Sequence, residues 1–257
     1  MKGEKFLPIS LKETQERGWA EVDFVYVCGD AYVDHPSFGA AIITRVLEAQ
    51  GFNVAFLAQP KFNNCNDFKR FGKPRLGFLV SAGNIDSMVA HYSVAKRKRN
   101  YDYYSPGGKA GLRPDRATEV YCKLIRQAYP DTAIIIGGLE ASLRRFAHYD
   151  YWNDEVLDSL LVTSGADILT YGMGENIIRK IAQLLDKGVP VSKIRDVRGT
   201  VWLGEKGDKI HYDYTGEWDI EKLKTDKEYY AGAFAVQYKN LSRYYFQFTI
   251  ELYLDKT

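Results

Sequence analysis

The sequence has few cysteines, and no two of them are close together. Cys28, Cys65 and Cys122 are the three that it contains. An odd number of cysteines without a close pair fits neither a disulfide framework nor a CxxC metal site. We therefore expect a protein of the reducing cytoplasm that folds without metal or disulfide cross-links.

Long apolar runs and a recognisable export signal are also missing. No stretch of about 18 apolar residues occurs anywhere in the chain. The first ten residues carry charges at Lys2, Glu4 and Lys5 and lack an apolar segment of signal length. We expect neither a signal peptide nor a membrane partner.

The chain also lacks an excess of charge of one sign and several familiar catalytic motifs. Its 35 basic and 33 acidic residues give a formal net charge of +2, so a nucleic-acid partner would require a local basic patch. The sequence contains no nucleophile elbow, Walker loop or HExxH motif. These absences exclude the enzyme classes that depend on those motifs.

What the sequence does contain is a series of short apolar runs, each followed by a turn with Gly or Ser. The runs that predict strands are residues 24–28, 53–58, 76–80, 133–136 and 168–171. Helical spacing is found at residues 38–50, 115–129 and 176–186. Continuous apolar strands that alternate with helices are typical of a parallel sheet buried on both faces. The pattern predicts a doubly wound, mostly parallel α/β sheet of the flavodoxin-like type.

The pattern changes after about residue 198. Residues 200–203 and 209–214 are short and β-like, and residues 226–238 have helical spacing. We therefore predict a Rossmann-like N-terminal domain over residues 1–198. Residues 199–257 are predicted to be a small α+β extension, the start of an incomplete second unit.

Candidate ligand-binding residues follow the predicted strands. In open α/β sheets ligands bind at the carboxyl ends of the strands, where glycines and helix N–H groups suit phosphate or carboxylate. The candidates for cofactor or small-molecule binding are His35, Ser81, Gly137, Gly138, Glu140, Gly172 and Gly174. A structural role remains open for several: a tight turn at the glycine pair, a favourable helix dipole for Glu140 and a polar surface position for His35.

A basic and aromatic segment, residues 96–104, lies between the third and fourth predicted strands. It contains four consecutive basic residues, Lys96 to Arg99, followed by Tyr101, Tyr103 and Tyr104. Such a segment can bind nucleic acid by charge and stacking, or a protein partner. The near-zero net charge favours a solvated loop and argues against nucleic acid.

Four long strings carry a resemblance to a known family. They are GDAYVDHPSFG (29–39), FLVSAGN (78–84), SPGGKAG with RPDRAT (105–118) and GGLEASLRRFAHYDYW (137–152). Over residues 6–240 the chain resembles the N-terminal region of the YgiQ-type radical SAM family. In that family the region precedes a radical SAM barrel, in which a CxxxCxxC motif holds a 4Fe-4S cluster that cleaves S-adenosylmethionine.

This chain departs from that pattern because no three cysteines are close enough to hold a cluster. The resemblance therefore implies a domain or fragment that is inactive alone, with no cofactor of its own and with the barrel as its partner in full-length relatives. From Leu241 the tail is atypical of the family. We hypothesise a frameshift or premature stop near Asn240.

The same region is similar to cobalamin-binding domains, in which a histidine loop, a serine and a glycine pair follow successive strands. His35, Ser81 and the pair Gly137 and Gly138 stand in those places. The usual DxHxxG spacing is broken here, which argues against cobalamin. Two other functions remain open: a free-standing corrinoid- or nucleotide-binding module, and an interaction module that uses residues 96–104.

Overall fold

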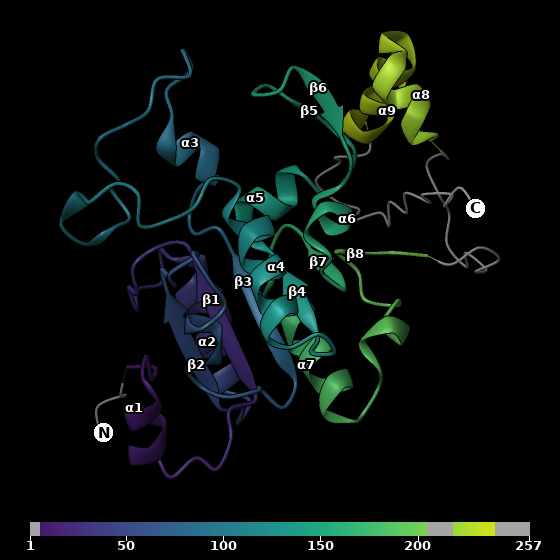
Figure 1. Ribbon diagram of the computed structural model, residues 1–257. Coiled ribbons are helices and arrows are strands. Elements are labelled where there is room, and N and C mark those ends of the chain that lie inside the picture. Colours follow the sequence, from purple (N-terminus) through teal and green to yellow (C-terminus); the bar gives the residue numbers. More distant parts are fainter. Residues whose placement is uncertain (1–5, 205–217, 240–257) are drawn as a thin grey trace.

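The computed structural model describes residues 6–204 and 218–239, and a six-stranded sheet forms its centre (Figure 1). The strand order is β2-β1-β3-β4-β7-β8. The strands are β1 (Phe24–Cys28), β2 (Val54–Ala58), β3 (Gly77–Ser81), β4 (Ile134–Ile136), β7 (Ile168–Thr170) and β8 (Thr200–Trp202). The first five are parallel and β8 is antiparallel to β7. This order confirms the predicted doubly wound, flavodoxin-like fold.

Burial on both faces explains why the apolar runs form the central strands. All five residues of β1 and of β3 are buried, although their side chains point alternately to the two faces. A surface strand would alternate with polar residues, whereas a central parallel strand needs apolar residues throughout. β1 lies between β2 and β3, with Tyr26 opposite Phe56 on one side and Leu79 on the other.

Helices cover both faces of the sheet and create two cores. On one face α2 (Gly39–Glu48) and α7 (Glu175–Asp186) pack with alternate residues of the strands. On the other face lie α4 (Ala117–Ala128), α5 (Gly138–Leu143) and α6 (Leu160–Ser164). The helices predicted at residues 38–50, 115–129 and 176–186 are confirmed as α2, α4 and α7.

Several elements gather at the end of the sheet where the parallel strands finish, here called the carboxyl edge (Figure 1). They are α3 (Ser87–His91), the long loop at residues 92–116 with η2 (Pro106–Gly108), and the hairpin of β5 (His148–Asp150) and β6 (Glu155–Leu157). The opposite end carries α1 (Leu11–Glu16). The remaining short helices are η1 (Asp67–Lys69) and η3 (Val191–Lys193).

The C-terminal part begins within the sheet rather than after it. Residues 200–202 form β8, which pairs with the free edge of β7, so the sheet extends past residue 198, the predicted boundary. Beyond it, α8 (Ile220–Thr225) and α9 (Lys227–Lys239) pack beside the hairpin, where Tyr149 N donates to the Tyr230 hydroxyl. The strand expected at residues 209–214 and the tail from residue 241 lie outside the described residues. None of the helices described is long and apolar enough to cross a membrane.

Candidate functional site

A cavity of about 230 Å³ opens at the carboxyl edge, between α2 and α7; we call it the first cavity. Its floor is made by the ends of β1, β3, β4 and β7, and its side walls by the first turns of the two helices. Ile43 and Ile178 supply apolar surface, and Asn84 and Glu175 supply polar groups. The buried Tyr26 also lines the cavity, and its burial raises the pKa of the hydroxyl, which keeps it neutral.

The helices that begin beside the first cavity differ from four others in how they begin. No side chain caps the start of α2 at Phe38 or the start of α7 at Gly174. In contrast α1, α3, α6 and α8 each begin with a side chain that accepts from a backbone N–H, namely Ser10, Asp86, Ser159 and Asp219. α5, which begins at Gly138 in the cavity wall, is also uncapped, and at α4 the side chains of Ser87 and Glu140 accept from the first N–H groups. The first N–H groups of a helix need an acceptor from outside the helix. At α2 and α7 a ligand in the cavity can supply it.

Five of the seven predicted residues line the first cavity together. They are Ser81, Gly137, Gly138, Gly172 and Gly174. The glycine pair is required by close packing: a Cβ at Gly137 would lie 2.6 Å from Thr170 Oγ1, and Gly138 has a φ of +85°. The pair therefore serves a tight turn and a cavity wall at the same time.

His35 lies elsewhere, on the outer side of α2. It is exposed, its Nδ1 accepts from Ser37 N at 3.1 Å, and it lines a separate, open cavity of about 650 Å³ with Arg45 and Glu48. An ion pair between Asp34 and Arg45 of α2 holds this segment away from the sheet edge. The structure does not bring His35 to the first cavity.

Glu140 also lies outside that cavity, and it has a different set of partners. It is buried, and its Oε2 accepts from Ser87 N at 2.8 Å and from Ser87 Oγ at 2.5 Å. Its Oε1 accepts from Thr118 N at 3.1 Å. One carboxylate thus satisfies N–H groups at the starts of α3 and α4, which fixes both helices on the same face of the sheet.

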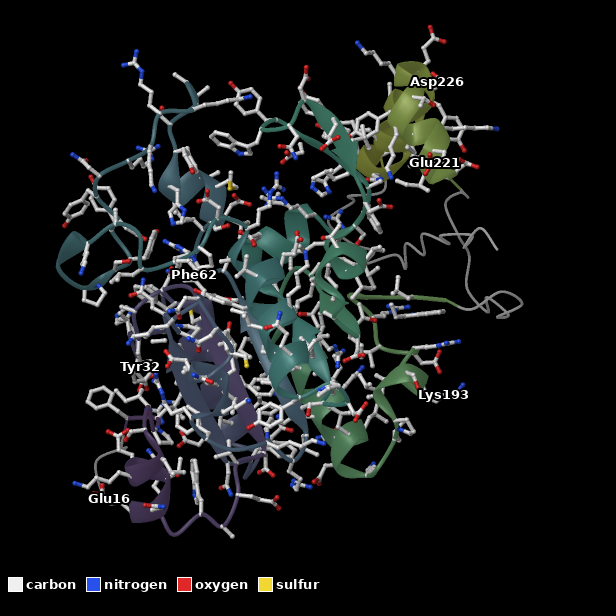
Figure 2. All side chains as sticks on the ribbon, in the orientation of Figure 1. Glu16, Tyr32, Phe62, Lys193, Glu221 and Asp226 are labelled. Carbon is white, nitrogen blue, oxygen red and sulfur yellow. The ribbon has the colours of Figure 1, made fainter. Side chains whose placement is uncertain are left out.

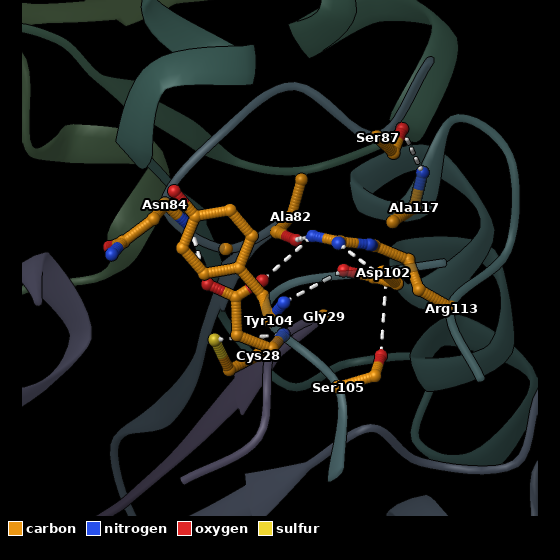
Figure 3. Close-up of polar contacts among 12 residues, drawn as sticks. Cys28, Gly29, Ala82, Asn84, Ser87, Asp102, Tyr104, Ser105, Arg113 and Ala117 are labelled. Atoms are coloured by element: carbon orange, nitrogen blue, oxygen red, sulfur yellow. Dashed lines mark hydrogen bonds and ion pairs between the residues drawn. The ribbon is translucent and has the colours of Figure 1, made fainter. Parts of the chain in front are cut away.

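A buried ionic cluster, which sequence reasoning did not identify, joins the 92–116 loop to the sheet (Figure 3). Arg113 Nη1 donates to Asp30 Oδ1 at 2.7 Å and to Ala82 O at 2.9 Å, while Nη2 donates to Asp102 Oδ2 at 2.8 Å. Asp30 Oδ2 also accepts from Asn84 N at 2.7 Å. The RPD string at residues 113–115 holds an arginine beside a proline, but nothing local in it indicates burial between two distant carboxylates.

The two carboxylates of this cluster differ in their protonation. Burial raises the pKa of Asp30 to about 6, although the Asn84 N–H and the Arg113 guanidinium act to lower it. Burial acts on Asp102 in the same direction, but the Tyr104 N–H and Arg113 outweigh it and hold the pKa of Asp102 below its ordinary value. Asp30 therefore changes charge near neutral pH, next to residues that line the first cavity.

The basic segment at residues 96–104 is partly engaged with the β5–β6 hairpin. Lys96 Nζ lies 4.8 Å from the centre of the Tyr151 ring and donates to Trp152 O at 3.1 Å. Tyr151 in turn donates from its hydroxyl to Val94 O at 2.8 Å. These contacts attach the loop to the hairpin through one of its four basic residues.

The cysteines do not fit an iron–sulfur cluster. Cys28 is buried at the end of β1 in the core beneath α2 and α7, and Cys122 is buried in α4 on the other face of the sheet. Burial raises the pKa of Cys28 to about 12 and raises that of Cys122 as well, so both remain thiols. Within residues 6–204 and 218–239 no three His, Cys, Asp or Glu side chains are grouped as metal ligands. The donor set for a 4Fe-4S cluster is not assembled by these residues.

The fold defines a doubly wound α/β domain with a cavity at the carboxyl edge of its sheet. Comparison with known proteins identifies the family to which this domain belongs. The model of the family described as Radical SAM N-terminal matches residues 6–254. The chain therefore belongs to the Radical SAM N-terminal family, which confirms the resemblance found in the sequence.

Curated relatives are considerably longer than this chain. A UPF0313 protein of Clostridium botulinum (strain ATCC 19397 / Type A) is 54% identical over 233 residues, which are 91% of this chain and 36% of that protein. A UPF0313 protein of Clostridium perfringens (strain ATCC 13124) is 51% identical over 238 residues, 93% of this chain and 36% of that protein. The chain thus spans about a third of the length of the curated relatives it matches.

One solved structure was also found to be similar. It is the radical S-adenosylmethionine methyltransferase TsrM from Kitasatospora setae, determined with tryptophan substrate and a SAM analogue bound. The TM-score is 0.48 at 17% identity, with 72% of this chain and 29% of that chain covered.

Proposed function

We propose that this domain is the ligand-binding N-terminal part of a radical SAM protein and that it binds a nucleotide-sized molecule in the first cavity. The observation that carries the proposal is the pairing of a carboxyl-edge cavity with two helix starts that no side chain caps. Backbone N–H groups at such positions favour a phosphate or carboxylate. Ile43 and Ile178 suit the apolar part of the same ligand.

The size of the cavity favours a small ligand over a corrinoid. Sites for drug-sized ligands are usually about 300–1,000 Å³, whereas the first cavity has about 230 Å³. The phosphate of a nucleoside monophosphate would lie at the open helix starts, and the part of the nucleoside that this volume does not hold would extend out of the cavity. A corrinoid ring is much larger, and His35, the residue expected to contact it, lies outside the cavity lining.

We assign the radical chemistry to another part of the full-length proteins. The buried thiols of Cys28 and Cys122 lie on opposite faces of the sheet, so this domain does not cleave S-adenosylmethionine by itself. When bound elsewhere in such a protein, a cluster would supply the electron for that cleavage. The role left to this domain is to bind and orient a ligand at the edge of its sheet.

Amide NMR tests the proposal directly. Adenosine 5′-monophosphate (AMP) is titrated into the ¹⁵N-labelled chain, and the amides of residues 39–41 and 173–176 are followed. We expect saturable shifts at these amides, with weaker shifts from adenosine because it lacks the phosphate. Absence of shifts at both helix starts up to millimolar AMP would contradict the proposal.

A further inference from the structure

A second cavity, of about 240 Å³, lies in the loop that joins α3 to α4, apart from the first cavity. Basic residues dominate its wall: His91, Lys98, Arg99 and Arg113 all line it. Two aromatic residues, Phe62 and Tyr101, line it as well, and both are partly exposed. Figure 2 shows Phe62 beside this loop at the carboxyl edge.

The carboxylates of the wall are already occupied by internal partners. Asp102 accepts from Arg113, as described above, and Asp115 accepts from His91 Nδ1 at 2.5 Å and from the Tyr92 hydroxyl at 2.7 Å. Burial acts to raise the pKa of Asp115, but these two hydrogen bonds outweigh it and hold that pKa below the ordinary value. Both carboxylates therefore have hydrogen-bond partners of their own, and the charge of Lys98 also lowers the pKa of Asp115 without a direct contact.

Lys98 and Arg99 are the exposed cations of this wall. Both are exposed, and in the part of the chain that the structure describes neither makes an ion pair with an acidic side chain. Arg99 uses its Nε to donate to Tyr92 O at 3.2 Å, which orients the guanidinium without neutralising it. Two adjacent cations thus border the cavity, and among the described residues neither is in direct contact with a carboxylate.

A buried guanidinium N–H and a buried imidazole nitrogen of the same wall also lack a partner. His91 and Arg113 are 6% and 1% exposed, and His91 Nε2 and Arg113 Nε have no hydrogen-bond partner among the described residues. Buried polar atoms are usually hydrogen-bonded, and an unpaired one calls for an explanation such as a bound ion or water. Arg113 Nε carries a hydrogen and therefore points to an acceptor that is bound beside this wall.

We propose that the second cavity binds the phosphate group of a small molecule, held mainly by Lys98 and Arg99. Arginine and lysine are the side chains that bind phosphate most effectively, and adjacent aromatic rings suit a flat group on the same molecule. This site is distinct from the first cavity and does not depend on the function proposed for it. It also gives a specific role to Lys98 and Arg99 of the basic segment at residues 96–104.

The neighbouring basic residues separate this proposal from general nucleic-acid binding. Arg97 belongs to the same basic run and is also exposed, but it does not line the cavity. A surface that grips a nucleic acid by charge would use Arg97 as much as Arg99. A phosphate site in the cavity uses Arg99 and not Arg97.

Titration of inorganic phosphate into the ¹⁵N-labelled chain at constant ionic strength tests the site. We expect saturable shifts in residues 98–102 and 110–115, and an affinity about tenfold weaker in Arg99→Gln and in Lys98→Gln. Arg97→Gln is the matched control and should keep the affinity of the unmodified chain. All three side chains are exposed, so the variants are expected to fold.

Four results would overturn the proposal. The first is a linear, non-saturating response of the loop amides. The second is an equal loss of affinity in Arg97→Gln and Arg99→Gln. The third is tighter binding of a single-stranded oligonucleotide that all three substitutions weaken alike, which would indicate charge along the whole run. Phosphate shifts confined to residues 39–41 and 173–176 would likewise place binding in the first cavity and contradict a second site.

Discussion

Arg113 Nη1 lies 2.7 Å from Asp30 Oδ1, a contact between residues 83 positions apart that joins the loop before α4 to the end of β1. Both side chains are almost completely buried. Replacing Arg113 by Met removes the cation and leaves Asp30 and Asp102 buried without it. We expect the free energy of unfolding to fall by about 3–5 kcal/mol, measured by urea denaturation.

The control for this substitution is Arg97→Met, which removes an exposed arginine of the same loop. Surface substitutions of this kind usually change stability by less than about 0.5 kcal/mol. Equal stability of the two variants would show that the buried cluster does not anchor the loop.

Because the pKa of Asp30 is raised in the folded chain, the free energy of unfolding should decrease as the pH rises. Its pKa in the folded chain is about 6, above its ordinary value of 3.8, so the folded state binds this proton more tightly than the unfolded state does. The stabilising contribution is complete below about pH 4 and is lost as the pH rises through about 6. We expect the stability of the unmodified chain relative to Asp30→Asn to decrease over that range.

Carboxyl ¹³C NMR measures the same property directly. The signal that is lost in Asp30→Asn should titrate near pH 6 in the unmodified chain. A midpoint below 4 would contradict the account, because it would mean that Arg113 outweighs burial at this carboxylate.

Glu140 provides a test of a structural role against a ligand-binding role. Glu140→Ala leaves the Ser87 and Thr118 N–H groups without their acceptor, so stability should fall by at least about 1–3 kcal/mol. Glu175→Ala is the matched control, since Glu175 also lies in a first helical turn but is half-buried and lines the first cavity. We expect Glu175→Ala to change AMP binding more than stability, and Glu140→Ala to change stability more than AMP binding. The opposite pattern would give the structural role to Glu175 and the ligand-binding role to Glu140.

The parts of this fold that the sequence predicts are those set by local patterns. Continuous apolar runs become central strands because both faces of the sheet are covered, as the fully buried β1 shows. Parallel strands end at one edge, so residues that follow different strands, such as Ser81, Gly138 and Gly172, meet in one cavity.

Other parts depend on long-range contacts that leave no local signal. Glu140 stands in a first helical turn, as many glutamates do, and only the approach of α3 and α4 makes it a shared cap. His35 directly follows Asp34, whose ion pair with Arg45 holds the segment outside α2. The hairpin at residues 148–157 escaped prediction because its aromatic residues fit packing on a sheet edge equally well.

The cysteine arrangement predicts the outcome of anaerobic reconstitution with iron and sulfide. Because the thiols of Cys28 and Cys122 are buried on opposite faces of the sheet, we expect far less than four iron atoms per chain by metal analysis. A brown protein with stoichiometric iron and sulfide would show that the cysteines assemble a cluster after all.

Calorimetric titration with AMP tests the central claim, ligand binding in the first cavity, most directly. A side chain at Gly39 would enter open space beside α2, so Gly39→Leu should fold normally and obstruct the cavity, whereas Ser37→Leu adds the same side chain outside it. We predict that AMP binds the unmodified chain and Ser37→Leu with equal affinity and binds Gly39→Leu at least about tenfold more weakly. Equal affinity in all three proteins, or no binding to any of them, would contradict the account.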